Sequence, residues 1–328
     1  MYVGLDISKN STVAVWKDDK GNKIDGGIFS TDTQGLQKLA EKLKGCEVAL
    51  EASTSGVFVY DYLSTKGLPI KVANPNAIKL ISHSDKKTDK SDAEKLADLL
   101  RTNMLPTCYM PDKKIRETRD LIRHRRALVN TKTVLKNKVR AILTREGLRL
   151  PYRDVLGQRS LQWLYKVEVG TVQKDAINKF LHLALTIDDE IQDYNRKLAS
   201  ERWENKNARL LDTIPGIGEY SAMHIMAIIG DIKRFSSDEE LASYAGLVPR
   251  IYQSGDVQYT RGLKPGEKSL KWVLIECAHT AVKFSKRFRK YYKKKLRKKN
   301  KQKAIVAVAR KMVEIIYCML TRGEEYRE

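Results

Sequence analysis

Residues 2–30, YVGLDISKNSTVAVWKDDKGNKIDGGIFS, decide the fold of the first part of the chain. Apolar and polar residues alternate in Tyr2–Ser8 and again in Ser11–Trp16, and this period of two is typical of β-strands. The turn-forming sequence DDKGNK separates the second segment from a third candidate strand, Ile24–Ser30. We therefore expect the chain to begin with three consecutive strands.

Helices and strands alternate in the next seventy residues. Thr33–Lys44 and Asp89–Leu100 are expected to be helices, and the first of them has its leucines on one face. The apolar runs Cys46–Glu51 and Leu68–Ala73 are typical of strands, and Val57–Leu63 between them is expected to be helical. Periodicity alone establishes an α/β unit, and this order of elements is that of an RNase H-like domain.

The composition points to a partner that carries negative charge. The 328 residues are enough for two or three compact units, and 42% of them are hydrophobic, which excludes a wholly disordered chain. Lys and Arg number 62 against 40 Asp and Glu, a formal net charge of +22. This charge is untypical of enzymes that act on small metabolites and is typical of proteins that bind nucleic acid.

Several other classes are disfavoured by what the sequence lacks. The four cysteines form no close pair and the five histidines do not cluster, so neither a disulfide framework nor a zinc site is expected. The longest apolar run, Ala222–Ile229, is far shorter than the ~18 residues of a membrane span. The first residues, MYVGLDISKN, do not have the pattern of a secretory signal. We expect a cytoplasmic, nucleoid-associated prokaryotic protein with no membrane partner.

The positive charge is concentrated in two later segments. Residues 1–100 have 14 lysines and 14 acidic residues, whereas residues 110–150 have 13 basic and four acidic residues. Residues 281–312 have 15 basic residues and no acidic one, and four aromatic side chains between them could stack on bases: Phe284, Phe288, Tyr291 and Tyr292. This distribution predicts two nucleic-acid surfaces, although a solvated charged face remains an alternative for residues 110–150.

The middle of the chain is predicted to be helical. Four apolar residues recur every seven positions between residues 116 and 148, which predicts one long helix with a coiled-coil seam: Leu121, Leu128, Leu135 and Ile142. A second helical pattern runs from Ile177 to Leu198. We expect the two helices to form an antiparallel hairpin or a dimer, and the apolar stripe to serve structure or oligomerisation.

The C-terminal part combines a tight turn, a long loop and two further helices. In LLDTIPGIGEY (residues 210–220), Pro215, Gly216 and Gly218 form a turn before a helix, an arrangement that resembles a helix-hairpin-helix. Backbone N–H groups at such a helix start can bind phosphate, but turns of this kind are also common between ordinary helices. Residues 246–271 are expected to be an elaborate loop, followed by helices at Ser269–Ser285 and Lys303–Leu320.

Four acidic residues of the first unit form a candidate metal site. Asp6 lies within the first strand, Glu51 ends the fourth, and Asp89 and Asp92 share one face of the last helix. In an RNase H-like fold these positions converge, and carboxylates that lie so close are held together by cations such as Mg²⁺. Two ions about 4 Å apart can bind the attacking and the leaving oxygen of a phosphodiester. Taken singly, each acid could instead be a surface residue or a helix cap.

The blocks MYVGLDISKN, ALEAS and KTDKSDAEKLADLL resemble those of the DEDD-type transposases of insertion sequence family 110. The similarity covers essentially the whole chain. It implies a RuvC-like domain at residues 1–108, coiled-coil and nucleic-acid-binding helices at 109–205, and a mostly helical transposase domain at 206–328. It also implies that the four acids are the ligands of two Mg²⁺ ions, with Mn²⁺ as a possible substitute.

The same resemblance assigns the nucleophile to Ser254, which Gly255 follows in PRIYQSGDV. Basic side chains around it would neutralise the scissile phosphate, and arginines of the long basic helix would contact nucleic acid: Arg250, Arg261, Lys264 and Lys271, then Arg123, Arg125 and Arg126. Two positions depart from the family pattern, because Glu267 stands where Asn is common and Lys271 where Arg is common.

These expectations describe a recombinase that cuts and rejoins target and donor DNA through a phosphoserine intermediate. The resemblance implies a bridge RNA as guide, and a homodimer that becomes a tetramer in the synaptic complex. One alternative is a metal-dependent nuclease of the Holliday-junction resolvase type, in which water attacks the phosphate. Another is a non-catalytic nucleic-acid-binding scaffold whose acids are ordinary surface residues.

Overall fold

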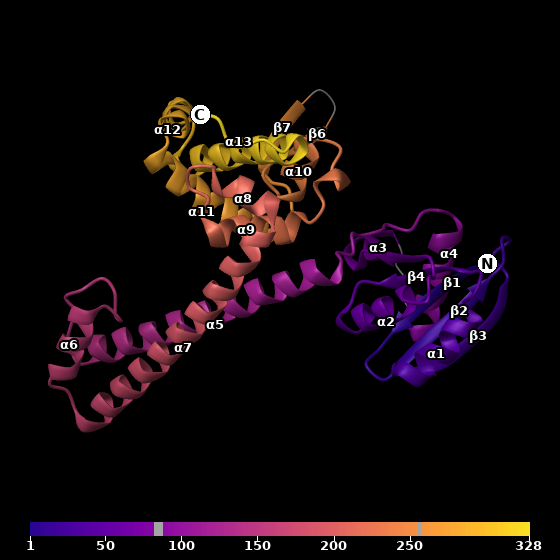
Figure 1. The fold of residues 1–328 in the computed structure, drawn as a ribbon, viewed down its shortest axis with the longest axis horizontal. Coiled ribbons are helices and arrows are strands. Elements are labelled where there is room, and N and C mark those ends of the chain that lie inside the picture. The colour runs from indigo at the N-terminus through magenta and orange to yellow at the C-terminus, as the bar shows by residue number, and fades with distance from the viewer. Residues whose placement is uncertain (82–87, 255–256) are drawn as a thin grey trace. The chain divides into compact units, whose positions relative to one another are not determined.

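The computed structural model describes residues 1–81, 88–254 and 257–328, and within the second β-sheet it describes only the backbone of Ile251, Ser254, Val257, Gln258, Thr260 and Arg261. The chain divides into two compact units, Met1–Met110 and Pro111–Glu328. Figure 1 shows a sheet with helices in the first unit and an almost wholly helical second unit. The predicted three-part division by function stays a prediction.

The first unit is built on a five-stranded sheet with the order β3-β2-β1-β4-β5. Its first three strands are antiparallel, and β1, β4 and β5 are parallel. The strands are β1 (Tyr2–Ile7), β2 (Ser11–Lys17), β3 (Lys23–Ser30), β4 (Glu47–Glu51) and β5 (Ile70–Ala73). All five lie within three residues of their predicted bounds, and the first and fourth strands are neighbours as expected.

Helices cover both faces of this sheet. Side chains of α1 (Thr33–Lys42) and α2 (Thr54–Ser64) pack with alternate residues of β1 and β4 in one hydrophobic core. The opposite face is covered by α4 (Asp89–Arg101). The short helix α3 (Pro75–Ile81) was not predicted, because it has no buried residue among its seven and therefore no apolar stripe in its sequence.

Gly4 allows α4 to lie directly on the sheet. A Cβ atom at this position would collide with the carbonyl oxygen of Ala93 and would lie 2.7 Å from the backbone nitrogen of Ala97. Any side chain at Gly4 would therefore push the helix away from β1. The position of α4 therefore determines how close its first turn, which contains Asp89 and Asp92, lies to the C-terminal ends of β1 and β4.

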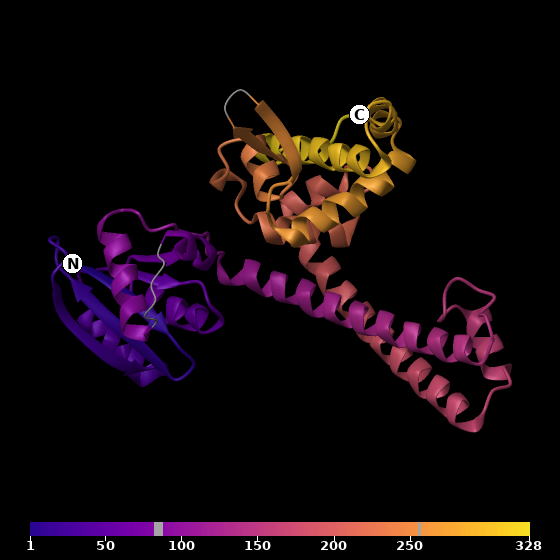
Figure 2. The ribbon, with the colours of Figure 1, turned by 180° about the vertical axis from the view of Figure 1, so that it is seen from behind.

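Two long helices open the second unit and lie antiparallel in a single chain (Figure 2). They are α5 (Lys113–Arg145) and α7 (Thr171–Glu204), joined through α6 (Gln158–Lys166). Ion pairs fix the antiparallel register: Lys114 contacts Glu204 at 3.1 Å, and Lys132 contacts Asp188 at 2.6 Å. The structure therefore shows the predicted antiparallel hairpin of two helices. A coiled-coil supercoil and a role in oligomerisation stay predictions. The helix α6 was not predicted.

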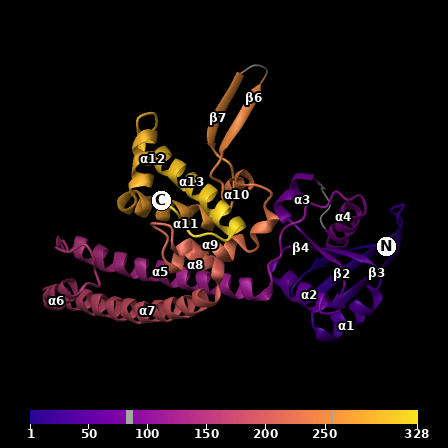
Figure 3. The same ribbon diagram turned by 45° about the horizontal axis from the view of Figure 1, so that its top comes forward.

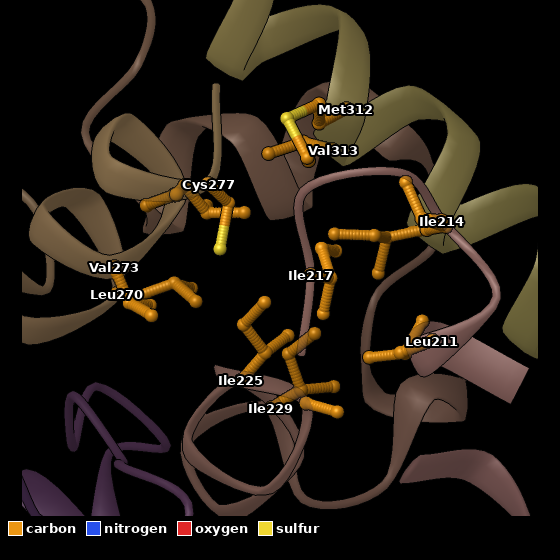
Figure 4. Close-up of a cluster of buried hydrophobic side chains, with 14 of the residues drawn as sticks. Leu211, Ile214, Ile217, Ile225, Ile229, Leu270, Val273, Cys277, Met312 and Val313 are labelled. Carbon is orange, nitrogen blue, oxygen red and sulfur yellow. The ribbon is translucent and has the colours of Figure 1, made fainter. Parts of the chain in front are cut away.

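The remaining helices share one large hydrophobic core. They are α8 (Lys206–Asp212), α9 (Glu219–Ile229), α10 (Asp238–Tyr244), α11 (Lys268–Phe284), α12 (Lys286–Leu296) and α13 (Lys301–Arg322), with a 3₁₀ turn at Ile232–Arg234. Figure 4 shows side chains from four of these helices and from the turn between α8 and α9 meeting in this core. The bounds of α11 and α13 agree with the two predicted C-terminal helices to within two residues.

The turn between α8 and α9 packs into the same core. Ile214 and Ile217 are buried, and a Cβ atom on Gly216 would lie 2.6 Å from the carbonyl oxygen of Cys277 in α11 (Figure 4). Gly216 also has a φ of +95°, which side-chain-bearing residues rarely adopt. The glycine at this position is therefore explained by packing, while phosphate binding by the turn stays a prediction.

The expected loop at residues 246–271 contains a β-hairpin, which corrects the sequence analysis. Strands β6 (Pro249–Ser254) and β7 (Val257–Leu263) form an antiparallel pair that projects from the helices of the second unit (Figure 3). The apolar and polar residues at positions 257–260 do alternate, but this run is short and stands among glycine, serine and basic residues, which are typical of a loop. None of the helices in the described parts of the chain combines the length and the apolar character that a membrane span requires.

Candidate functional site

The sheet register places Asp6 and Glu51 on neighbouring strands. Leu5 of β1 pairs with Leu50 of β4 in a parallel ladder, and the two acids are the next residues along their strands. Side chains alternate between the faces of a sheet, so both acids belong to the face that α4 covers at Gly4. The predicted convergence of β1, β4 and the last helix is therefore present in the backbone.

The first turn of α4 brings two more carboxylates to this region. Asp89 and Asp92 are the acidic residues of that turn. Thr88, and not Asp89, is the N-cap residue, because its hydroxyl oxygen accepts a hydrogen bond from the backbone N–H of Ser91 at 3.2 Å. Asp89 is thus not needed as the cap, which was the ordinary structural explanation for its presence.

The electrostatics of Asp6 reflect both its burial and the other three acids. Burial raises the pKa of Asp6 from 3.8 to about 6, with further contributions from the negative charges of Asp89, Asp92 and Glu51. A hydrogen bond with the backbone of Ile7 lowers this pKa, but by less. The half-buried carboxyl of Asp6 is therefore at the centre of a region of negative potential.

A lysine partly compensates this negative charge. The ammonium group of Lys95, one turn further along α4, contacts the carboxylate of Asp92 at 3.0 Å. In the described parts of the chain, no three His, Cys, Asp or Glu side chains are arranged so that they could hold a metal ion. The four acids therefore interact through their charges without forming a closed set of ligands. Sequence analysis did not identify Lys95, although its i,i+3 spacing from Asp92 is a usable signal.

A hollow of about 550 Å³ lies beside Asp89. It is bounded by the start of α4 and by residues of β2 and β3, and its lining includes Lys23, Lys90, Gly26 and Gly27. Two adjacent glycines inside a strand leave its surface open, and they are the sequence signal that could have indicated this hollow.

Ser254 is the last residue of β6, and its backbone pairs with Val257. Its side chain, the following Gly255 and the side chain of Arg261 lie outside the described residues. Two of the other predicted phosphate-binding residues are close to it in sequence: Arg250 belongs to β6, and Lys264 directly follows β7. Arg250 donates a hydrogen bond to the hydroxyl of Tyr252 at 3.1 Å, and Lys264 is exposed.

The base of the hairpin meets the start of α11. The ammonium nitrogen of Lys271 would lie 3.1 Å from a Cβ atom placed on Gly246, so this lysine lies against the chain that leads into the hairpin. Glu267 is the N-cap of α11, and its carboxylate accepts a hydrogen bond from the backbone N–H of Ser269 at 3.1 Å. Glu267 therefore has a structural role in this chain as a helix cap.

The predicted arginines of α5 differ in their surroundings. Arg123 is exposed and contacts Asp120 at 3.1 Å. The Nε of Arg125 donates a hydrogen bond to Asn195 of α7 at 2.6 Å, and its guanidinium lies 3.9 Å from the centre of the Tyr220 ring. Arg126 lies over the ring of Trp272 at 4.9 Å. Arg125 in particular is engaged in packing within the second unit, and nucleic-acid contact by all three stays a prediction.

A buried polar pair, missed by sequence analysis, lies next to these arginines. His224 of α9 is 1% exposed, and its Nε2 lies 2.7 Å from the hydroxyl oxygen of Ser269. Burial, followed by the charges of Arg126 and Arg125, lowers the pKa of this imidazole from 6.5 to about 4. The histidine is therefore uncharged at neutral pH. A lone histidine in an apolar run carries no sequence signal for such a contact.

The helix α12 presents its cations in a different way. A hollow of about 490 Å³ runs along it, and every residue that lines the hollow is basic: Lys286, Arg289, Lys290, Lys293, Lys294 and Arg297. We call these six residues the α12 basic face. Their spacing of three and four residues places them on one side of the helix.

The aromatic residues of α12 lie on its other side, and burial of Phe288 corrects the expectation that it stacks on bases, whereas stacking by the other three stays a prediction. Phe288 is 1% exposed and belongs to the core, and Tyr291 and Tyr292 pack against it. Phe284, at the end of α11, is 76% exposed. The aromatic and basic residues that are mixed in the sequence separate in space, because they alternate with the period of a helix.

Comparisons with known proteins agree with this architecture. A transposase profile of the DEDD type, defined on IS110, matches residues 3–146, and the profile of the transposase IS116/IS110/IS902 family matches residues 208–293. The chain belongs to this transposase family. The N-terminal match spans the sheet with its four acids, and the C-terminal match spans α8–α11, the hairpin and most of α12.

Curated relatives of this transposase match it along most of their length. The transposase for insertion sequence element IS1111A of Coxiella burnetii is 27% identical over 99% of this chain and 91% of that protein. The transposase for IS1328 of Yersinia enterocolitica is 25% identical over 98% and 97% of the two chains. A pilin gene-inverting protein of Moraxella bovis is 27% identical over 99% and 97%.

Proposed function

We propose that this transposase cuts and rejoins DNA strands by combining a divalent-metal site in its first unit with Ser254 as nucleophile. The observation that carries the proposal is the register of β1 and β4, which makes Asp6 and Glu51 neighbours on the face that α4 covers with Asp89 and Asp92 in its first turn. Such an accumulation of negative charge costs stability unless cations neutralise it. The relative whose name states that it inverts a gene supports a reaction that rejoins DNA strands.

Asp6, Glu51, Asp89 and Asp92 are the proposed metal ligands. The donor set fits a hard divalent cation in its chemistry, because it consists of carboxylate oxygens, the ligands that Mg²⁺ prefers. Two Mg²⁺ ions, or Mn²⁺ in their place, are the proposed occupants. When bound, they would supply positive charge that stabilises the attacking oxygen and the leaving oxygen at the scissile phosphate. Binding of the ions competes with the ion pair between Lys95 and Asp92.

Ser254 is the proposed nucleophile. Its hydroxyl oxygen forms a bond to the scissile phosphorus, one P–O bond of the DNA strand breaks, and the released DNA oxygen takes up a proton in exchange for that of the serine. The phosphoserine link preserves a phosphodiester, so a second DNA hydroxyl can displace the serine without hydrolysis. Arg250, Arg261, Lys264 and Lys271 are proposed to neutralise the phosphate, and for Arg250 and Lys264 the structure describes side chains on or beside the hairpin.

A polyanion partner is supported by the α12 basic face, whose six cations line one hollow. A bridge RNA remains the proposed guide. Basic side chains on a helix recognise phosphate and shape, whereas sequence would be read by base pairing. A homodimer on RNA and a tetramer on DNA remain the proposed assemblies, since an exchange of strands requires more than one active site.

Trapping of a covalent adduct tests this mechanism. The complete protein with Mg²⁺ and its element's DNA and RNA should yield a protein–DNA species that survives a denaturing gel. Ser254→Ala should abolish the adduct, whereas Ser243→Ala, a change of the same size elsewhere in the second unit, should retain it. Asp6→Ala should abolish both the adduct and the heat of Mg²⁺ binding measured by isothermal titration calorimetry.

The alternatives give different results in the same experiment. A resolvase-type nuclease would cut DNA without an adduct and would tolerate Ser254→Ala, since water would be the nucleophile. A non-catalytic scaffold would neither cut DNA nor lose metal binding on Asp6→Ala. Either result would refute the serine mechanism.

A further inference from the structure

Two exposed tyrosines lie face to face on the β6–β7 hairpin. Tyr252 and Tyr259 are direct partners in the antiparallel register, and their rings are stacked with centroids 5.4 Å apart and an angle of 11° between their planes. Their exposed fractions are 36% and 52%. Both rings lie outside the hydrophobic core of the second unit. The hairpin projects from the helices, so the pair is presented to solvent (Figure 3).

Burial does not account for this pair. An isolated two-stranded hairpin is marginally stable in water, and exposed aromatic rings add little to it beyond their contact with each other. Exposed aromatic faces on a basic support are, in contrast, the usual means by which proteins hold unpaired bases. Arg250 binds the hydroxyl of Tyr252, and the two strands contain two arginines and no acidic residue.

We infer that the Tyr252–Tyr259 pair is a stacking platform for an unpaired base of the DNA strand that is cut. The inference rests on the proposed function, because it takes its substrate from the role of Ser254. Ser254 is two residues beyond Tyr252 in β6, and its partner Val257 is two residues from Tyr259 in β7. Two residues of a strand span ~7 Å. This separation is comparable to one or two nucleotides, which rise 3.4 Å each within a duplex strand.

The platform requires a base that has left the double helix. Within a duplex both faces of each base are covered by its neighbours, and enzymes that act on a single nucleotide gain access by unstacking it. A base on the tyrosines would hold the adjacent phosphate near the end of β6, with Arg250 beside the platform. Stacking does not depend on which base is bound, so this contact positions the strand and leaves sequence selection to other parts of the complex.

Binding of single-stranded DNA tests the platform without relying on catalysis. The probe is a fluorescent oligonucleotide and the protein is full-length with Ser254→Ala, so that no strand is cut. Adding Tyr252→Ala or Tyr259→Ala should weaken binding about 10-fold, within the roughly 5- to 150-fold range of stacking contacts. Tyr252→Phe keeps the ring and should bind within about 2-fold of its parent. The salt dependence should stay the same, because no cation is removed.

An abasic site in the oligonucleotide provides the matching change on the DNA side. One abasic position should weaken binding to the parent protein as much as Tyr252→Ala does, and the two changes together should cost no more than one of them. Circular dichroism of each variant checks that the second unit remains folded. If the alanine variant is misfolded, Tyr252→Trp serves instead, and it should bind at least as tightly as the parent.

The outcomes separate this inference from the proposed function. An affinity for the oligonucleotide that Tyr252→Ala does not change would overturn the platform and leave the serine mechanism intact. Additive effects of the alanine substitution and the abasic site would have the same meaning. A tyrosine-dependent preference for single-stranded RNA over DNA would also overturn it as stated. A tyrosine-dependent affinity for DNA combined with the absence of a covalent adduct would refute the serine mechanism alone.

Discussion

The helices α5 and α12 are both rich in Lys and Arg, but they use their charge differently. In α5, Arg125 binds Asn195 and stacks on Tyr220, and Lys132 forms an ion pair with Asp188. In α12, six basic residues line a hollow together. Arg289 of this group also donates a hydrogen bond to the backbone carbonyl of Val282.

The difference follows from what each helix packs against. The helix α5 lies along α7 and contacts α9, so a large part of its circumference faces other helices. Phe288 anchors one side of α12 in the core, which leaves the opposite side to solvent. The charge of a segment therefore does not measure its capacity to bind a polyanion, since cations already held by protein carboxylates or aromatic rings have less to offer a phosphate.

The largest expected effect comes from removing charge from the α12 basic face. The triple change Lys290→Gln, Lys293→Gln and Lys294→Gln removes three cations that we expect to contact phosphates. Affinity for duplex nucleic acid should fall roughly 100-fold at physiological salt, and the slope of log K against log salt should become shallower by about 2.7. Fluorescence anisotropy at several salt concentrations measures both quantities.

The matched control removes the same charge from the first unit. Lys20, Lys38 and Lys44 are exposed, and the corresponding triple Gln variant should change the salt slope by less than about one. Equal effects of the two triple variants would mean that net charge, and not the α12 basic face, determines binding. The contrast between the two helices would then have no functional meaning.

Arg125→Ala tests the structural role assigned to α5. The variant loses a charged hydrogen bond to Asn195 and a cation–π contact with Tyr220. We expect a local destabilisation of about 2 kcal/mol, equivalent to about 30-fold faster hydrogen exchange of backbone amides in the adjacent part of α7. Mass spectrometry of the exchanged protein measures this rate.

The neighbouring exposed arginine is the control for this change. Arg123→Ala breaks only a surface ion pair with Asp120 and should alter exchange in α7 by less than about 0.5 kcal/mol. Similar exchange in both variants would show that Arg125 is not part of the packing, and α5 would become as plausible a nucleic-acid surface as α12.

The arginines of α5 also predict a pH dependence. Burial and the charges of Arg126 and Arg125 lower the pKa of His224 to about 4 in the folded state, against 6.5 in the unfolded chain. The folded state thus binds this proton less readily, so stability is lost as the pH falls from about 6.5 to about 4. The loss should be about 2 kcal/mol, and it should be absent from His224→Gln, as followed by urea unfolding at each pH. An unchanged pH profile in the variant would contradict this account.

The smallest expected effect concerns the four acids of the first unit, which gather negative charge around Asp6. The folded-state pKa of Asp6 is raised from 3.8 to about 6, so its stabilising contribution is complete below about 4 and is lost as the pH rises through 6. At pH 7.5 with a chelator, Asp6→Asn should be more stable by about 1 kcal/mol, a value reduced for solvent screening of a half-buried group. The difference should vanish at pH 4.

Adding Mg²⁺ should reverse the order of stabilities at pH 7.5. Bound ions stabilise the folded protein with its four carboxylates, while the variant lacks one ligand. Thermal unfolding with and without the ion measures the change. A gain from Mg²⁺ that is equal in both proteins would place the ions away from Asp6.

Local patterns in the sequence were sufficient to predict much of the first unit. Alternation in Tyr2–Ser8 and the helical stripe of Thr33–Lys44 each depend on neighbours within a few residues, and the structure confirms them. The elements that were missed lack such a stripe. The helix α3 buries no residue, and the hairpin holds Tyr252 and Tyr259 by cross-strand pairing.

The sequence by itself determined the residue types: four separated acids, two basic segments, and a serine followed by glycine at position 254. Only the tertiary structure decided which of these groups influence one another. Gly4 lets α4 approach β1, and burial, together with the nearby charges of Asp89, Asp92 and Glu51, raises the pKa of Asp6. Likewise, the packing of α5 and α12 decided which cations remain at the surface. The physical reason is that interactions between charges depend on distance and burial, which are set by residues far apart in the chain.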